Sequence, residues 1–287
     1  MTTLTKDADV GELKQIAKRL RVRILEMGRA MASKPDEAGS GHPSTALSSV
    51  EIVTALHFSR LNWDPKDSGK PDRDRFILSK GHGVPVLYAA YAEAGAIPDD
   101  ELKTLRRTGS RLQGHPDPTR LPFVEAATGS LGQGLSIAMG LALGAKLDGA
   151  SWRTYCLMGD GEIEEGQVWE AAMSAPRFEL DNLCAIVDNN TIQQTSSVAE
   201  ILPTLNPIAA KWEAFGWHLI EIDGHDLDAV LAALDEAART KGKPTVIVAH
   251  TVKGKGVSFM ENKTNWHGKG VTEEQLAEAL KEINADG

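Results

Sequence analysis

Two short polar motifs, each at the end of an apolar run, are the residues of this chain best suited to chemistry. Gly159-Asp160-Gly161 follows the run 154–158, and Asn189-Asn190 follows the run 183–187. With a helix-length spacer between them, the two runs predict a strand, a helix and a second strand. The carboxyl ends of parallel strands lie at one edge of a sheet, so we expect Asp160 and Asn190 to meet there on one divalent cation. The glycines would let a phosphate group approach the backbone.

A simpler interpretation of each motif has to be weighed against this one. Glycine, aspartate and asparagine are common turn residues, so Gly159-Asp160-Gly161 alone is more often an ordinary turn at the end of a strand. The complete span, with both flanking apolar runs, favours a ligand site over two unrelated turns.

Composition narrows the class of protein. The chain has 287 residues, a net charge of −9 and a pI near 5.4, which argues against nucleic-acid binding because that function usually needs a basic face. The N-terminal segment has no signal-peptide pattern, and no apolar run is long enough to span a membrane. Cys156 and Cys184 lie within apolar runs, so we interpret them as buried free thiols of a cytoplasmic protein.

The pattern of apolar residues predicts alternating strands and helices. This order is typical of an α/β fold with a mainly parallel central sheet and helices on both faces. No compositional break divides residues 1–287, so we expect a single domain. The expected strands are 75–78, 154–158, 183–187, 217–222 and 245–249, and the expected helices are 9–32, 44–59, 83–94, 99–107, one that ends at 147, 206–215 and 227–239.

Four histidines stand in turns that are rich in glycine or proline. Any one of them is more often a hydrogen-bonded loop residue than a functional group. Four such turns in a chain that also carries the strand-end motifs favour a functional set, composed of His42, His82, His115 and His267. The other four lack this setting, and we interpret them as structural: His57, His218, His225 and His250.

The strand-end motifs resemble the thiamine diphosphate-binding motif, and together with the histidine turns they resemble the N-terminal, diphosphate-binding domain of transketolase. The likeness runs from about residue 40 to about residue 270. The matching segments occur in the same order: Ser40-Gly41-His42-Pro43, Ser79-Lys80-Gly81-His82, Gly114-His115-Pro116, residues 128–134 (TGSLGQG) and His267-Gly268.

This resemblance implies a role for each matching residue. It implies thiamine diphosphate and Mg²⁺ as cofactors, with Ca²⁺ or Mn²⁺ as possible substitutes for the magnesium. The metal ligands would be Asp160, Asn190 and the backbone carbonyl of Ile192. The cofactor would contact His82, His267, Gly129, Leu131, Gly159, Gly161 and Asn190, and the residues acting on the sugar or at the subunit interface would be His42, His115, His267 and Glu165.

Three positions stand apart from the rest of the match. Glu165 matches a carboxylate that the family places at a subunit interface, but without the resemblance it would be interpreted as a surface glutamate early in a helix. Ser44 and Ser130 stand where many relatives have glycine and proline. Both are expected near the substrate channel, so we expect the donor preference to differ rather than the binding of the cofactor.

The resemblance also implies a partner. In the family, the glutamate that activates the cofactor and the arginines that hold the substrate phosphate lie in later domains, which this sequence does not contain. We therefore expect the N-terminal subunit of a split transketolase, which would move a two-carbon ketol unit between sugar phosphates. Its partner would be a C-terminal subunit with the pyrimidine-binding domain, and two copies of each chain would form an α2β2 complex. Two alternatives are the α-type subunit of a 2-oxo acid dehydrogenase or decarboxylase and a non-catalytic cofactor-binding homologue.

Overall fold

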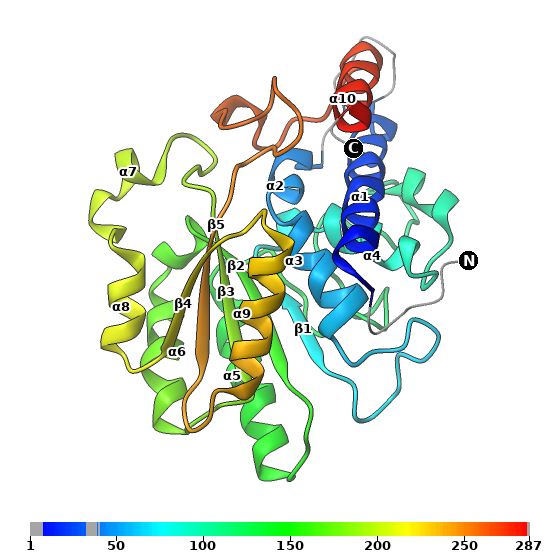
Figure 1. The fold of residues 1–287 in the computed structure, drawn as a ribbon. Coiled ribbons are helices and arrows are strands. Elements are labelled where there is room, and N and C mark those ends of the chain that lie inside the picture. Colours follow the sequence, from blue (N-terminus) through cyan, green and yellow to red (C-terminus); the bar gives the residue numbers. More distant parts are fainter. Residues whose placement is uncertain (1–7, 33–38, 40, 286–287) are drawn as a thin grey trace.

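A parallel five-stranded sheet forms the centre of the described structure. The computed structural model describes residues 8–32, 39 and 41–285. The strand order is β1-β2-β3-β5-β4, and each neighbouring pair is parallel (Figure 1). The predicted strands are confirmed within a residue or two: β1 Arg75–Leu78, β2 Thr154–Gly159, β3 Leu183–Asn189, β4 His218–Asp223 and β5 Thr245–His250.

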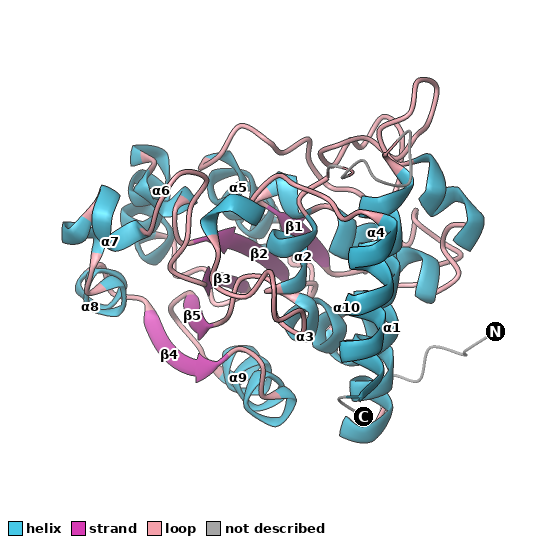
Figure 2. Cartoon of the chain, turned by 90° about the horizontal axis from the view of Figure 1, so that it is seen from above, coloured by secondary structure: helices cyan, strands magenta, loops and turns pink. Residues whose placement is uncertain are grey.

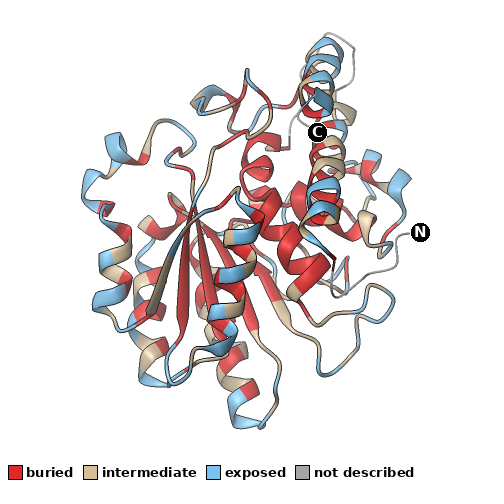
Figure 3. Cartoon of the chain, in the orientation of Figure 1, coloured by how far each residue is buried: buried red, intermediate tan, exposed pale blue. Residues whose placement is uncertain are grey.

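The central strands are buried on both faces, as Figure 3 shows. Strands covered on both sides can be apolar at almost every position, which explains runs such as residues 183–187. Side chains alternate between two cores, so that Cys156 lies in one core and Cys184 in the other. Both cysteines are buried free thiols, as predicted.

Helices cover both faces of the sheet (Figure 2), which confirms the predicted α/β class. One face is covered by α5 Gln133–Leu147, α6 Gly166–Arg177 and α8 Ile208–Ala214. On the other face lie α3 Val50–Ala55 and α9 Leu227–Arg239, with α1 Val10–Ala30, α4 Pro85–Glu93 and α10 Glu273–Ala285 packed beyond them. None of the helices in the described ranges is long and apolar enough to cross a membrane.

The prediction of one helix over 44–59 was wrong. That segment forms α2 Pro43–Leu47, then α3, then a π-helical turn over Leu56–Arg60. Two serines separate α2 from α3: the Ser48 hydroxyl donates to the Thr45 carbonyl at 2.9 Å, and the Ser49 hydroxyl donates to the Ala46 carbonyl at 3.3 Å. Such local bonds compete with helical hydrogen bonding, and propensity alone does not reveal them.

Three further helices differ from the prediction. Residues Asp99–Thr104 form a 3₁₀ helix in place of the helix expected at 99–107. The sequence analysis missed α10, although its start carries a recognisable signal. The backbone N–H of Gln275 donates to the Thr272 hydroxyl, and the N–H of Thr272 donates to the Gln275 side chain, which is the reciprocal pattern of a capping box. The short α7 Val198–Ile201 was not predicted either.

Candidate active site at the carboxyl edge of the sheet

Asp160 and the segment around Asn190 come together at the carboxyl edge of the sheet. Asp160 follows β2 and Asn190 follows β3. The Asp160 carboxylate accepts hydrogen bonds from the backbone N–H of Gly161 at 2.8 Å and of Thr191. The Asn190 side-chain oxygen accepts from the Ile192 N–H at 3.2 Å. Asp160 and Asn190 are both buried, so the oxygens predicted to bind a metal share one enclosed corner.

The chemistry of this corner fits a hard divalent cation. Burial, and then the nearby charge of Asp188, raise the pKa of Asp160 to about 7. A cation would offset both effects. The described residues hold no cluster of three acidic, histidine or cysteine ligands, so the protein would supply one carboxylate with amide and carbonyl oxygens. Mg²⁺ uses such a limited protein set when phosphate oxygens and water complete its coordination.

Two lysines that the sequence analysis did not single out lie beside this corner. The Lys253 ammonium donates to the Ile192 carbonyl at 3.3 Å and to Nδ1 of His267 at 2.9 Å. Burial, followed by the charge of Lys80, lowers the pKa of Lys253 to about 8. Lys253 thus places a positive charge between the predicted metal corner and the histidines, where an anionic group would be stabilised.

Lys80 and Asp188 form a fully buried ion pair under the site. The Lys80 ammonium also donates to the Thr45 carbonyl at 3.1 Å. Asp188 accepts further hydrogen bonds from Ser48 at 2.6 Å and from Thr251. Burial alone would raise the pKa of Asp188, but Lys80 and these hydroxyls hold it below its usual value. The pair joins the end of β3, which carries Asp188, to the turns that follow β1 and β5 and to the serine turn after α2.

A second buried carboxylate, Glu162, joins the turn after β1, the end of β2 and the start of α5. It accepts hydrogen bonds from the backbone N–H of Gly132 at 2.9 Å and of Gly159 at 3.1 Å, and from the Ser79 hydroxyl. Glu162 was not among the predicted site residues, whereas Glu165, three residues further on, was. Glu165 is exposed at the start of α6 and is therefore accessible to a partner subunit; its predicted interface role remains a prediction.

Three of the four predicted histidines form one cluster. The ring centroids of His42, His82 and His267 are 5.1–5.3 Å apart, and His82 stacks on His267. Burial is the largest cause that lowers their pKa values, to about 4 for His42, well below the ordinary value for His82 and to about 3 for His267. All three imidazoles are therefore neutral near pH 7 and can each donate one hydrogen bond and accept another.

The fourth histidine, His115, packs on the turn that contains Gly129. A β-carbon at Gly129 would come within 2.9 Å of the His115 ring, and the φ of +138° also favours glycine there. Gly81 packs on Thr128 in the same way, since a β-carbon at Gly81 would lie 2.7 Å from the Thr128 backbone. The segment Thr128–Gly129 therefore contacts the turns of both His82 and His115. Leu131, two residues after Gly129, is half-buried.

A cavity of about 490 Å³ opens beside the histidine cluster. It contains His42 and His267 together with polar residues that the sequence analysis did not name: Gln194, Thr264, Asn265 and Lys269. Of the two departures from the family pattern, Ser130 is exposed, whereas Ser44 is fully buried and donates to the Trp266 carbonyl at 2.8 Å. The Ser44 hydroxyl does not line the cavity but supports the His267 loop from beneath, and its place near the substrate channel stays a prediction. Ser40 of the predicted motif lies outside the described residues.

Comparison with known proteins agrees with this arrangement. Residues 20–286 match the family described as the thiamine diphosphate-binding domain of transketolase. The chain is 45% identical over 249 residues to the 6-deoxy-6-sulfo-D-fructose transketolase subunit SqwG of Clostridium sp. MSTE9, covering 87% of this chain and 90% of that one. It is 44% identical over 272 residues to one of the subunits of the apulose-4-phosphate transketolase of Actinobacillus succinogenes, covering 95% and 96%.

The fold comparison gives the same family. Transketolase from Campylobacter jejuni superposes with a TM-score of 0.88 at 31% identity, over 96% of this chain and 43% of that one. The chain also spans only 42% of the length of the vertebrate transketolases that it matches. The chain belongs to the transketolase family and corresponds to its thiamine diphosphate-binding domain.

Proposed function

We propose that this chain is the N-terminal, cofactor-binding subunit of a two-chain transketolase. The complex would transfer a two-carbon ketol unit from a ketose phosphate to an aldose phosphate. The observation that carries the proposal is the convergence of the cluster His42, His82 and His267 with Asp160 and Asn190 at one sheet edge.

Thiamine diphosphate, when bound, supplies the carbanion chemistry of ketol transfer, and this chain would supply its binding and the proton-handling groups near the sugar. Asp160, Asn190 and the Ile192 carbonyl would hold Mg²⁺, or Ca²⁺ or Mn²⁺ in its place. His82 and His267 would donate to the diphosphate, and the glycines of the Gly159-Asp160-Gly161 turn and Gly129 would give it access to the backbone.

His42 and His115 are proposed to act on the sugar hydroxyls. Burial is the largest cause that lowers both pKa values, and for His115 the charge of Arg106 adds to it. A neutral imidazole has one N–H and one free nitrogen, so each ring can donate a hydrogen bond to a sugar hydroxyl or accept one from it. His42 lines the cavity of about 490 Å³, so it is placed to meet a substrate there.

A partner subunit is supported by the two relatives that are named as transketolase subunits and that this chain covers almost completely. We propose that the partner carries the pyrimidine-binding domain with its activating glutamate, and that two copies of each chain form an α2β2 complex in the cytoplasm. Exposed apolar side chains on α5 and at the end of α6 support such contacts: Ile137, Leu147, Met173 and Phe178. Exposed apolar groups of this kind often mark subunit interfaces.

We propose that the donor is an anionic sugar, either a sugar phosphate or a related sulfonated sugar. One relative is named for a sulfonated sugar and another for a sugar phosphate. Of the alternatives, the 2-oxo acid dehydrogenase type is not favoured, because the relatives are transketolases. The second alternative, a non-catalytic cofactor-binding role, is distinguished from the proposed catalytic role by the reconstitution experiment below.

The test is reconstitution with a candidate C-terminal subunit and an assay of ketol transfer. We expect activity from the mixture and none from this chain alone. Robust transfer by the pure chain would refute the two-chain proposal, and failure with every plausible partner, despite good cofactor binding, would favour the non-catalytic role.

The metal assignment is tested in the same complex with Asp160→Ala. Loss of the charged ligand should weaken Mg²⁺-dependent binding of thiamine diphosphate by well over tenfold, measured by calorimetry. Asp148→Ala, at an exposed aspartate after α5, is the matched control and should bind normally. Near wild-type affinity in Asp160→Ala would overturn the assignment.

A further inference from the structure

A second cavity lies between α1, α10 and the turn that follows β5. Its volume is about 220 Å³, which is below the range of about 300–1,000 Å³ that is usual for drug-sized ligands, so it suits a small molecule or ion. Its charged and titratable lining consists of Lys14, Lys18, Arg21, Lys255, Glu51 and His225. Four cations and one carboxylate therefore face one small space in a chain whose net charge is −9.

The single carboxylate is already neutralised. One oxygen of Glu51 accepts from the Arg21 guanidinium at 2.6 Å, and the other is 2.9 Å from Nδ1 of His225. The backbone N–H of Val252 donates to Nε2 of His225 at 2.8 Å. His225 must therefore carry its proton on Nδ1 and is neutral while it donates to Glu51. The negative charge of Glu51 thus neutralises that of Arg21, and the positive charges of Lys14, Lys18 and Lys255 remain in the cavity.

The partners of the three lysines leave their positive charge largely uncompensated. Lys18 donates to the uncharged Asn284 carbonyl at 3.2 Å. Lys255 lies 3.8 Å from Glu261, and both side chains are about a third exposed or more, so this ion pair is weak. Lys14 is exposed and has no ion-pair partner among the residues that the structure describes.

We propose that this cavity binds a small oxyanion: inorganic phosphate or sulfate, or the phosphate group of a small monoester. The ammonium groups of Lys14, Lys18 and Lys255 would donate to its oxygens, with the buried Arg21 at its base. Charge-assisted hydrogen bonds of this kind are the strong ones in proteins.

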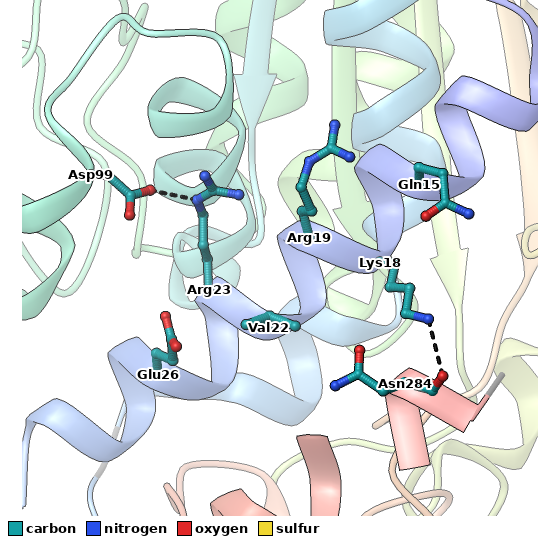
Figure 4. Close-up of a pocket in the computed structure, with 8 residues that line it drawn as sticks. All are labelled: Gln15, Lys18, Arg19, Val22, Arg23, Glu26, Asp99 and Asn284. Atoms are coloured by element: carbon teal, nitrogen blue, oxygen red, sulfur yellow. Dashed lines mark hydrogen bonds and ion pairs between the residues drawn. The ribbon is translucent and has the colours of Figure 1, made fainter. Parts of the chain in front are cut away.

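A neighbouring hollow on α1 does not share this property. It has a volume of about 450 Å³, and Figure 4 shows Lys18, Arg19 and Arg23 among its lining residues. Both arginines are paired with Glu93, and Arg23 is also paired with Asp99, as the dashed line in Figure 4 shows. Because its arginines are committed to carboxylates, this hollow has less charge to offer an anion.

The anion cavity is connected to the candidate active site through one turn. Arg21 donates to the Lys255 carbonyl at 3.4 Å, and His225 holds the backbone N–H of Val252. Lys253 lies between Val252 and Lys255 in the sequence, and it contacts Ile192 and His267. An anion that holds Arg21 and Lys255 therefore orders the turn that carries Lys253. On the proposed function, the oxyanion would then raise the affinity for thiamine diphosphate, and the cofactor would raise the affinity for the oxyanion equally.

The site itself is tested by calorimetry of the full chain, without cofactor or partner, so that the result does not depend on the proposed function. Inorganic phosphate, sulfate and glycerol phosphate are titrated separately at a constant ionic strength of about 0.15 M. We expect wild-type binding and a loss of about tenfold or more in Lys14→Gln/Lys255→Gln. Tighter binding of glycerol phosphate than of phosphate would identify a monoester as the ligand, and the reverse would identify the free ion.

The control is Lys241→Gln/Lys243→Gln, which removes the same charge from two exposed lysines before β5 and should bind as wild type does. Equal weakening in both double variants, or no anion binding by the wild-type chain, would overturn the proposal. Lys14→Gln alone changes one exposed side chain, and it gives the same comparison if the double variant does not fold. Repeating the titration with thiamine diphosphate and Mg²⁺ tests the linkage separately.

Discussion

Removing Lys80 should destabilise this chain severely, because it would leave a buried carboxylate without its counter-charge. Asp188 is 0% exposed and Lys80 is 1% exposed, so water cannot replace the lost ammonium. Lys80→Met keeps an unbranched side chain that is one atom shorter, and it removes the charge and the hydrogen bond to the Thr45 carbonyl. Breaking a buried pair in this way costs about 3–5 kcal/mol of the free energy of unfolding.

Because Asp188 keeps other hydrogen-bond partners, we expect the loss in the free energy of unfolding to lie at the lower end of this range. The hydroxyls of Ser48 and Thr251 and the amide of Asn190 still donate to it after the substitution. They stabilise the charge but do not neutralise it, so we expect a loss of about 3 kcal/mol rather than 5. Asp188→Asn in the Lys80→Met background removes the unpaired charge and should restore about 1–2 kcal/mol.

The assay is urea unfolding of the full chain, followed by the fluorescence of tryptophans, of which Trp212 and Trp217 are buried. Lys241→Met is the control, since Lys241 is exposed and its loss should change the free energy of unfolding by less than about 0.5 kcal/mol. A loss below about 1 kcal/mol in Lys80→Met would refute the reasoning. So would a double variant that is no more stable than the single one, because the unpaired charge would then not be the cause.

Three further perturbations have defined outcomes. Gly134→Ala should lower the free energy of unfolding in urea by about 1–3 kcal/mol, because its β-carbon would lie 2.2 Å from the Ser79 hydroxyl. Gly144→Ala on the same helix is the control: its β-carbon meets nothing within 4 Å, so it should raise the free energy of unfolding by up to about 1 kcal/mol. Equal effects of the two substitutions would contradict the packing described at Gly134. Burial lowers the pKa of His57 from 6.5 to about 4, so the unfolded state takes up the proton first as the pH falls, and stability should drop by up to about 3 kcal/mol between these pH values. The His57→Phe variant should lose less of its free energy of unfolding between these pH values than the wild-type chain does. Identical pH profiles for the two proteins would show that His57 is not the cause of the loss. In the reconstituted complex, His115→Ala should lower kcat more than cofactor affinity and His82→Ala the reverse, and equal losses of cofactor affinity with turnover retained would contradict the assigned roles.

Most of the sheet could be predicted from the sequence because local patterns determine it. Apolar runs such as 183–187 identify buried parallel strands, and the polar residues after them mark the edge where ligands bind. The helix break at Ser48 and Ser49 could not be predicted in this way. It depends on side-chain bonds to the backbone and, for Ser48, on a contact with Asp188, which lies 140 residues away.

The same distinction applies to the site. The motif residues Asp160 and Asn190 and the histidines stand in recognisable turns, so their types and neighbours pointed to them. The burial of Lys80, Asp188 and Glu162 carries no such signal, because charged residues are ordinarily solvated. Lys80 stands in a quoted motif turn and Asp188 near the end of β3, but the sequence does not show that they pair. Lys80 meets its partner 108 residues away, and Glu162 meets Ser79 across 83 residues. Only the folded arrangement shows that these charges are buried and paired.

The two buried aspartates at this edge differ in how their negative charge is compensated. Asp188 has a lysine and two hydroxyls as partners, and its pKa is lowered despite burial. Asp160, equally enclosed, receives the backbone N–H groups of Gly161 and Thr191, and the negative charge of Asp188 lies near it. A buried carboxylate without a neutralising side chain is unfavourable in a folded protein unless a ligand compensates it. The fold therefore satisfies the charge of Asp188 with its own side chains, whereas the charge of Asp160 has no such partner. This difference supports the proposal that Asp160, rather than Asp188, is the metal ligand.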